Sequence, residues 1–67
     1  MNTRFNIDGM SCEHCKKRVE KAIAGVEGVN SVVVSLEDGA ATVDYARSEG
    51  IEARIIEAVE QAGYDVV

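Results

Sequence analysis

The chain has 67 residues and a formal net charge of −5, with two cysteines, one histidine and no proline. A chain of this length forms one small domain, so we expect residues 1–67 to share a single core. The acidic balance argues against a nucleic-acid partner, which needs clustered lysine and arginine. No apolar run approaches the ~20 residues of a membrane span, and no signal-peptide pattern follows Met1. Both observations favour a protein of the cytoplasm.

Hydrophobic spacing predicts four elements and a turn in the first two thirds of the chain. Residues 4–8 alternate polar and apolar side chains, as in a strand with one buried face. From about residue 13 the apolar residues recur at the spacing of an amphipathic helix, which Gly25 and Gly28 end, with Gly25 suited to the left-handed position after the last helical residue. Residues 29–36 and 40–45 alternate again, and the Asp38-Gly39 pair between them is typical of a hairpin turn.

The last third completes the pattern. A second helix is predicted after Ser48, which is suited to its N-cap, and ends at Gly63; residues 64–67 are long enough for a last strand. The order β-α-β-β-α-β predicts an α+β fold, a ferredoxin-like βαββαβ sandwich in which two helices cover one face of a four-stranded antiparallel sheet. In that topology the loop after the first strand and the loop after the second helix share one end, which brings Tyr64 towards the cysteines.

Both cysteines and the histidine lie within one stretch, Gly9-Met10-Ser11-Cys12-Glu13-His14-Cys15. A helix start and the basic run at residues 16–18 both stabilise negative charge, so the two thiols are expected to ionise readily. Two thiolates suit a soft ion that accepts few ligands, such as Cu(I), Ag(I) or Hg(II), whereas a structural zinc ion normally takes four. The sequence therefore predicts a site for a soft metal ion.

A CxxC pair at a helix N-terminus is also a redox device, which makes a thiol–disulfide oxidoreductase the alternative from the enzyme class. Proteins of that kind usually place a cis-proline opposite the pair, and this chain has neither proline nor tryptophan. It also has no Ser–His–Asp set and no glycine-rich phosphate-binding loop. The sequence predicts a binding protein that is not an enzyme.

The residues around the two thiols have alternative roles. His14 is interpreted as tuning the thiolates, with direct ligation as the alternative, because neighbouring positions at a helix start diverge. Met10 is interpreted as apolar packing rather than as a sulfur ligand. Tyr64 is either a core side chain or a hydrogen-bonding neighbour of the site. Lys16-Lys17-Arg18 is either a solvated helix face or a docking surface for an acidic partner.

The stretch from Gly9 to Cys15 resembles the GMxCxxC signature of heavy-metal-associated domains, and particularly of their bacterial copper chaperones. The similarity covers the whole chain, including Ala62-Gly63-Tyr64-Asp65-Val66. The resemblance implies that Cys12 and Cys15 bind Cu(I), that Met10 packs under the loop and that Tyr64 lies beside it. Ser11 stands where zinc-type relatives often carry aspartate, and Tyr64 where mercury carriers often carry phenylalanine, so both positions favour copper.

The resemblance also implies a function and partners. The domain would pass copper by ligand exchange to the metal-binding domains of a copper-transporting P-type ATPase, and a copper-responsive regulator is a further partner. Cys12, in the loop, is expected to release copper before Cys15, which is held on the helix. We expect a monomer without copper; with copper, the sequence leaves both a monomer and a copper-bridged dimer open, and His14 is a candidate further ligand in the dimer. A carrier or an N-terminal ATPase module for silver, mercury or zinc is the alternative with the same ligands.

Overall fold

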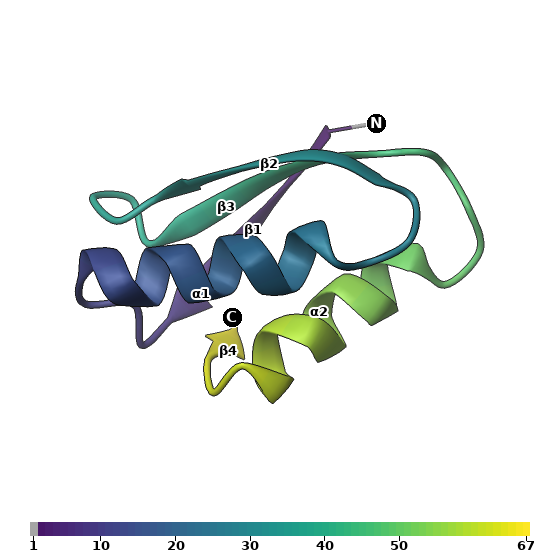
Figure 1. Cartoon of the computed structure of the whole chain (residues 1–67). Coiled ribbons are helices and arrows are strands. Elements are labelled where there is room, and N and C mark those ends of the chain that lie inside the picture. Colours follow the sequence, from purple (N-terminus) through teal and green to yellow (C-terminus); the bar gives the residue numbers. More distant parts are fainter. Residues whose placement is uncertain (1) are drawn as a thin grey trace.

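A computed structural model describes residues 2–67 (Figure 1). The elements, in chain order, are β1 (Asn2–Asp8), α1 (Glu13–Ala24), β2 (Val29–Ser35), β3 (Ala40–Tyr45), α2 (Ile51–Gln61) and β4 (Asp65–Val66). This order confirms the βαββαβ prediction. No helix within residues 2–67 has both the length and the apolar character needed to cross a membrane.

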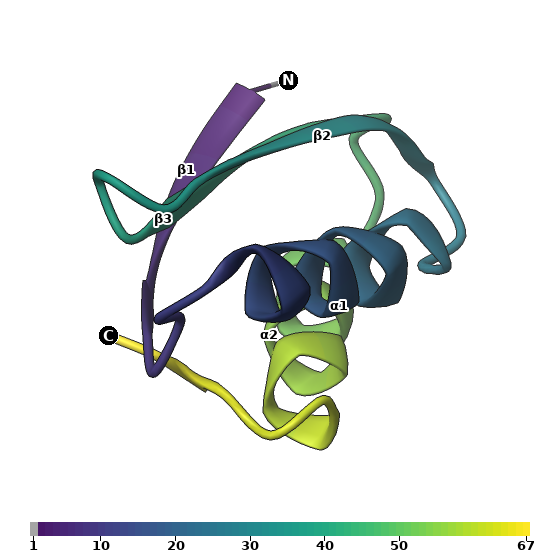
Figure 2. The same cartoon turned by 60° about the vertical axis from the view of Figure 1, so that its left-hand side comes forward.

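The four strands form one open antiparallel sheet with the order β2-β3-β1-β4. Both helices lie against the same face of this sheet, as the two views show (Figure 1 and Figure 2). β4 is short and pairs with the end of β1 at two positions, Ile7 with Val66 and Asp8 with Asp65. The ferredoxin-like sandwich with both helices on one face is therefore confirmed.

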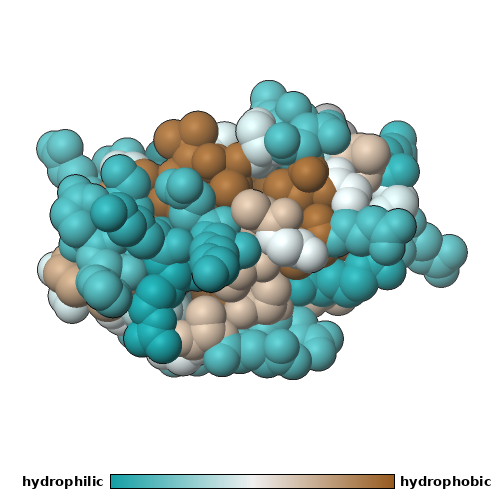
Figure 3. Space-filling view, in the orientation of Figure 1, coloured by the Kyte–Doolittle hydropathy of each residue, from teal (hydrophilic) through white to brown (hydrophobic). Residues whose placement is uncertain are grey.

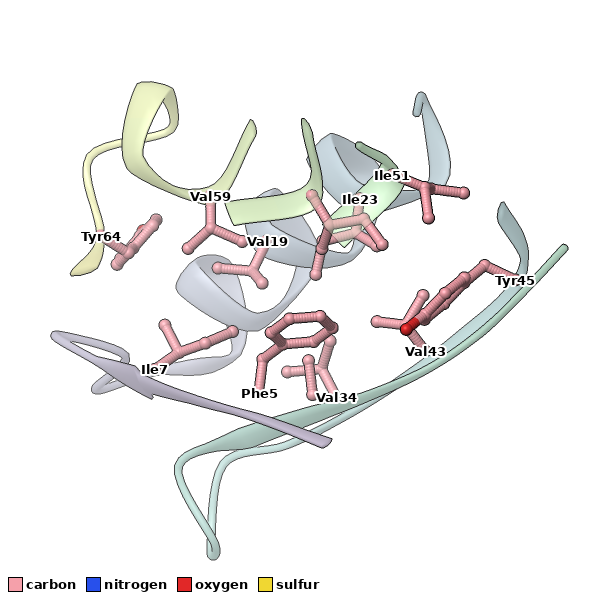
Figure 4. Close-up of a cluster of buried hydrophobic side chains, with 12 residues drawn as sticks. Phe5, Ile7, Val19, Ile23, Val34, Val43, Tyr45, Ile51, Val59 and Tyr64 are labelled. Atoms are coloured by element: carbon pink, nitrogen blue, oxygen red, sulfur yellow. The ribbon is translucent and has the colours of Figure 1, made fainter. Parts of the chain in front are cut away.

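The core fills the space between the sheet and the helices, and its residues follow the predicted periods (Figure 4). Alternate strand residues and the i, i+4 positions of both helices supply it, because those spacings place side chains on one face. Tyr45 is the largest of the fully buried side chains at 1% exposure, and its hydroxyl shares a hydrogen bond with Thr3 Oγ1 at 2.7 Å. The other members of the cluster are Phe5, Ile7, Val19, Ile23, Val34, Ala41, Val43, Ile51, Ile55, Val59 and Tyr64.

Two predictions about helix ends are wrong. Gly25 is the C-cap of α1 but keeps a right-handed conformation, with φ at −78°. The chain makes a further turn before it reverses, and Gly28 takes the left-handed φ of 98° instead. Ser48 does not cap α2 with its side chain: Gly50 is the N-cap, and the Ser48 carbonyl accepts a hydrogen bond from the Ile51 N–H at 3.4 Å. A turn follows Gly25 before β2 begins, and residues 49 and 50 separate Ser48 from α2.

The predicted meeting of two distant loops at one end of the sandwich is confirmed. The hairpin between β2 and β3 closes there, since the Ile7 N–H donates to the Gly39 carbonyl at 2.8 Å just before the loop that follows β1. At the other end of the chain, Gly63 turns the backbone with a φ of 100° and places Tyr64 over the end of β1. Figure 4 shows the Tyr64 ring beside Ile7 and Val59.

The turn before β2 should be more sensitive to a methyl group than the turn before α2. Gly28 and Gly50 both have positive φ, which costs an alanine about 1–2 kcal/mol. At Gly28 a Cβ would also lie 2.7 Å from Ile51 Cδ1, whereas nothing lies within 4 Å at Gly50. Because Ile51 is buried in the core, we expect Gly28→Ala to lower the free energy of unfolding by about 1–3 kcal/mol more than Gly50→Ala, measured by urea denaturation. Equal losses in the two variants would contradict this account.

Candidate metal centre

The two cysteines lie at the start of α1. Cys12 is the N-cap, with an extended backbone (φ −154°, ψ 169°), and its carbonyl accepts the first helical hydrogen bond, from the Lys16 N–H at 3.1 Å. Cys15 lies one turn further, so the two side chains are on the same side of the helix start. Both thiols are free, and their sulfurs are 3.5 Å apart. The predicted placement of Cys12 before the helix and Cys15 in its first turn is confirmed.

The two sulfurs have different surroundings. Cys12 is exposed, whereas Cys15 is half-buried and packs against the hydrophobic core. The pKa of Cys15 is lowered to about 6. The largest cause is a hydrogen bond from the backbone at Ser11, followed by hydrogen bonds from the Tyr64 side chain and from Cys12; partial burial opposes them. These hydrogen bonds favour the thiolate form of Cys15.

Tyr64 connects this loop to the end of the chain. Its side chain is 8% exposed, and the loop passes close to the ring, since a Cβ at Gly9 would lie 3.4 Å from Tyr64 Cδ1. The pKa of Tyr64 is raised, first by the hydrogen bond to Cys15 and then by burial and by the charge of that thiolate, while Arg18 opposes the shift. Tyr64 is both a core side chain and a hydrogen-bonding neighbour of Cys15, so both alternatives in the sequence prediction hold.

The other predicted residues are placed as follows. Met10 is half-buried and packs against the core from the loop, and His14 is exposed in the first turn of α1. Within residues 2–67, no group of three or more histidine, cysteine, aspartate or glutamate side chains is placed to hold a metal ion together. The described residues also enclose no pocket. The dithiol is thus an open surface feature.

Sequence reasoning missed two contributors to the site. One is the backbone at Ser11. Its hydrogen bond is the largest cause of the lowered pKa of Cys15, and it does not depend on which residue type occupies position 11. The other is Arg18, which interacts with Tyr64 as well as belonging to the basic run. A signal for the second was available, because Arg18 is three residues after Cys15 and such positions are neighbours on a helix surface.

The basic run lies on the same turn of the helix as the thiols. Lys16 is half-buried, while Lys17 and Arg18 are exposed. The helix N-terminus carries a partial positive charge of its own. A protein with a formal net charge of −5 therefore presents local positive charge beside its two cysteines.

The fold and the site together define a class of small domains. Each is a ferredoxin-like sandwich with an open CxxC dithiol, a candidate metal site, where its first strand joins its first helix. The profile of the heavy-metal-associated domain family matches residues 4–65. The chain is a member of the heavy-metal-associated domain family.

Its similarity to individual members is high over nearly the whole length. The Copper chaperone CopZ of Staphylococcus aureus (strain bovine RF122 / ET3-1) is 45% identical over 63 residues, which cover 94% of this chain and 93% of that protein. A solved structure of a CopZ metallochaperone covers all of both chains with a TM-score of 0.94 and 42% identity. The N-terminal domain of a potential copper-translocating P-type ATPase from Bacillus subtilis, in the Cu(I)-loaded state, has a TM-score of 0.89 and 34% identity, covering 97% of this chain and 81% of that one.

The Tyr64 hydroxyl should control how readily Cys15 reacts. Alkylation of Cys15 by iodoacetamide should rise as pH increases through about 6, because only the thiolate reacts. In Tyr64→Phe the hydrogen bond is lost, so the midpoint of this rise should move to higher pH. Mass spectrometry of the alkylated peptide distinguishes Cys15 from Cys12. Tyr45→Phe, which removes the hydroxyl bonded to Thr3, is the matched control and should leave the midpoint unchanged; an unshifted midpoint in Tyr64→Phe would contradict the assignment.

Proposed function

We propose that this protein is a Cu(I) metallochaperone of the cytoplasm, which binds copper through the thiolates of Cys12 and Cys15 and gives it to a copper-transporting P-type ATPase. The observation that carries the proposal is the pair of free sulfurs 3.5 Å apart, open to the surface, with the pKa of Cys15 lowered to about 6. The relatives named as copper chaperones, which match nearly the whole chain, support it.

The choice of ion follows from the ligands. Thiolates are soft and select Cu(I), which accepts fewer ligands than zinc. With metal–sulfur bonds of about 2.3 Å, two sulfurs on opposite sides of one ion are about 4.6 Å apart. The observed 3.5 Å must therefore increase by about 1 Å when copper binds. Cys12 can supply this movement, because it is exposed and precedes the helix, whereas Cys15 is fixed on α1.

Transfer is a ligand exchange without oxidation or reduction. A thiolate of the partner bonds to the copper, the ion becomes three-coordinate, and the bond to Cys12 breaks before the bond to Cys15. Cys12 leaves with its electron pair as a thiolate or takes up a proton from water. Each exchange of one ligand makes one copper–sulfur bond and then breaks one, so direction depends on relative affinity and the protein catalyses no covalent reaction.

The neighbouring side chains support the two ligands. Tyr64 stabilises the thiolate of Cys15 by hydrogen bonding, and Met10 holds the loop against the core. His14 is exposed, which suits a tuning role in the monomer and leaves it free to join the cysteines in a copper-bridged dimer. A copper-responsive regulator would receive copper by the same exchange.

The basic run beside the cysteines would orient an acidic partner during docking. Lys16, Lys17 and Arg18 lie beside the dithiol, so an acidic surface around the partner's metal loop would bring the two sites together. Complementary charge acts mainly on the association rate, and salt screens it. The metal-binding domains of a copper ATPase are the partners that this proposal names, and a solved domain of such an ATPase shares this fold.

Copper binding should depend on both cysteines and much less on the rest of the loop. In an anaerobic Cu(I) titration against a colorimetric chelator, Cys12→Ser and Cys15→Ser should each lower the affinity by more than about 100-fold. Loss of a supporting residue typically costs 10–100-fold, so Tyr64→Phe should fall in or below that range and His14→Ala below about 10-fold. The same titration with Ag(I), Hg(II) and Zn(II) compares the alternative ions. Affinity that survives loss of either cysteine would contradict the ligand assignment.

Transfer to the isolated metal-binding domain of a copper ATPase should be fastest at low salt. Reversing charge beside the site in Lys17→Glu should slow the bimolecular rate by about 10-fold at low ionic strength, and the difference should shrink as salt is added. Lys21→Glu makes the same change in the last turn of α1 and is the control, with a smaller effect expected. Stopped-flow detection of copper in the acceptor measures both rates. Equal slowing by the two variants would show that the net charge of the protein, and not the basic run beside the cysteines, controls the association rate.

A further inference from the structure

β2 forms one edge of the sheet, and its sequence lacks the usual protection of an edge strand. Natural edge strands are blunted by charged side chains, proline or bulges. No charged residue and no proline occurs from Gly28 to Leu36. The register of β2 against β3 shifts only between Val29 and Ser31. The five residues from Ser31 to Ser35 therefore form a regular, uncharged edge.

This edge also carries unburied apolar surface. Val33 is 68% exposed, and Val67 is the one other large hydrophobic side chain among residues 2–67 with such exposure. Val32 is only partly buried where it packs against the core. Figure 3 shows hydrophobic surface, coloured brown, on the part of the molecule along which β2 runs in Figure 1. A strand added at this edge would cover these valines.

The backbone groups that face the open edge follow from the ladder. In antiparallel strands the N–H and C=O of successive residues point to alternate sides. The Ile7 N–H donates to the Gly39 carbonyl, so every second residue of β3 counted from Gly39 directs its backbone groups towards β1, and the residues between them direct theirs towards β2. Thr42 is one of those that face β2, and it pairs with Val33. The polar backbone of Val33 therefore faces β3, and that of its two neighbours in the strand faces outward.

We propose that β2 is a self-association surface, on which the β2 strand of a second copy pairs antiparallel about a two-fold axis at Val33. The stretch Ser31-Val32-Val33-Val34-Ser35 reads the same in both directions, so this pairing matches each residue type with its own kind. Val33 meets its equivalent as a pair without mutual hydrogen bonds. Val32 faces Val34 of the second copy, and each of these two symmetry-related pairs exchanges two backbone hydrogen bonds.

The charged residues nearest to this pairing lie outside the paired strands. Glu27 precedes Gly28 and Glu37 follows Leu36, so neither belongs to the uncharged stretch. The paired strands themselves bring no charge together, although each chain carries a formal net charge of −5.

The surface is separate from the metal loop and does not depend on the proposed function. In the sheet order β2-β3-β1-β4, the cysteine loop joins β1 to α1, and α1 packs against one face of β2, whereas an added strand would pair at the outer edge of β2. Pairing through β2 uses backbone groups of the strand and neither Cys12 nor Cys15. It therefore differs from a copper-bridged dimer, which needs the cysteines.

Sedimentation equilibrium of the reduced, metal-chelated full chain tests this pairing. One strand pair buries less than about 1,200 Å², which corresponds to weak association, so the range from about 20 μM to about 2 mM is appropriate. We expect association that Val33→Lys weakens by at least about 10-fold, because like charges would then lie opposite each other. Thr42→Lys is the matched control: Thr42 is the exposed β3 neighbour of Val33 on the same face and should change association by no more than about 2-fold. Circular dichroism checks that both variants fold.

Disulfide trapping gives an independent readout. In a Cys12→Ser, Cys15→Ser chain, Val33→Cys places two thiols at the two-fold axis, where Cα atoms of a pair without mutual hydrogen bonds are about 4.5 Å apart, within disulfide range. With oxidised glutathione as the electron acceptor, the linked dimer should form at least about 10-fold faster than in the same chain with Thr42→Cys. Persistence of the association in the chain without cysteines distinguishes it from copper bridging. A monomer across the whole concentration range, equal effects of the two lysines, or equal trapping rates would overturn the proposal.

Discussion

The hydrogen bonds that converge on the Cys15 sulfur connect the metal loop to the rest of the sandwich. One comes from the backbone at Ser11, one from the Tyr64 side chain and one from Cys12. Tyr64 reaches the sulfur because Gly63 turns the chain after α2 and β4 then pairs with the end of β1. The acidity of a residue in the first quarter of the chain thus depends on the chain's last four residues and on the packing that holds them.

This arrangement makes the two cysteines unequal. Cys15 is half-buried, fixed on a helix and stabilised as a thiolate from several sides, whereas Cys12 is exposed at an extended N-cap position. An ion held by one firmly fixed ligand and one exposed ligand can be retained and still exchanged, because an incoming thiolate displaces the exposed ligand first and the fixed ligand afterwards. If both ligands were equally fixed, the first exchange would already have to break a bond that the fold stabilises. The asymmetry therefore suits a protein that passes its ion on.

Most of the fold could be predicted from the sequence, because apolar residues at periods of 2.0 and 3.6 specify which faces meet. Topology alone placed Tyr64 near the cysteine loop. The helix ends were less predictable: Gly25 and Ser48 have the right chemistry for caps, but the length of each connecting turn is set by tertiary packing, as the close approach of Gly28 to Ile51 shows. The backbone contribution of Ser11 to the Cys15 pKa was not predictable either, since any residue supplies a backbone N–H.

The distribution of charge separates the encounters that these proposals describe. If two copies bring their metal loops together, Lys16, Lys17 and Arg18 of each copy approach the same run of the other. A copper-bridged pair must overcome that repulsion, whereas a partner domain with acidic residues around its site does not. The β2 edge, in contrast, carries no charge from Gly28 to Leu36, so nothing along the strand opposes its pairing with an identical copy. On this account, the metal loop favours a different protein as its partner, whereas the uncharged β2 edge favours a second copy of the same chain.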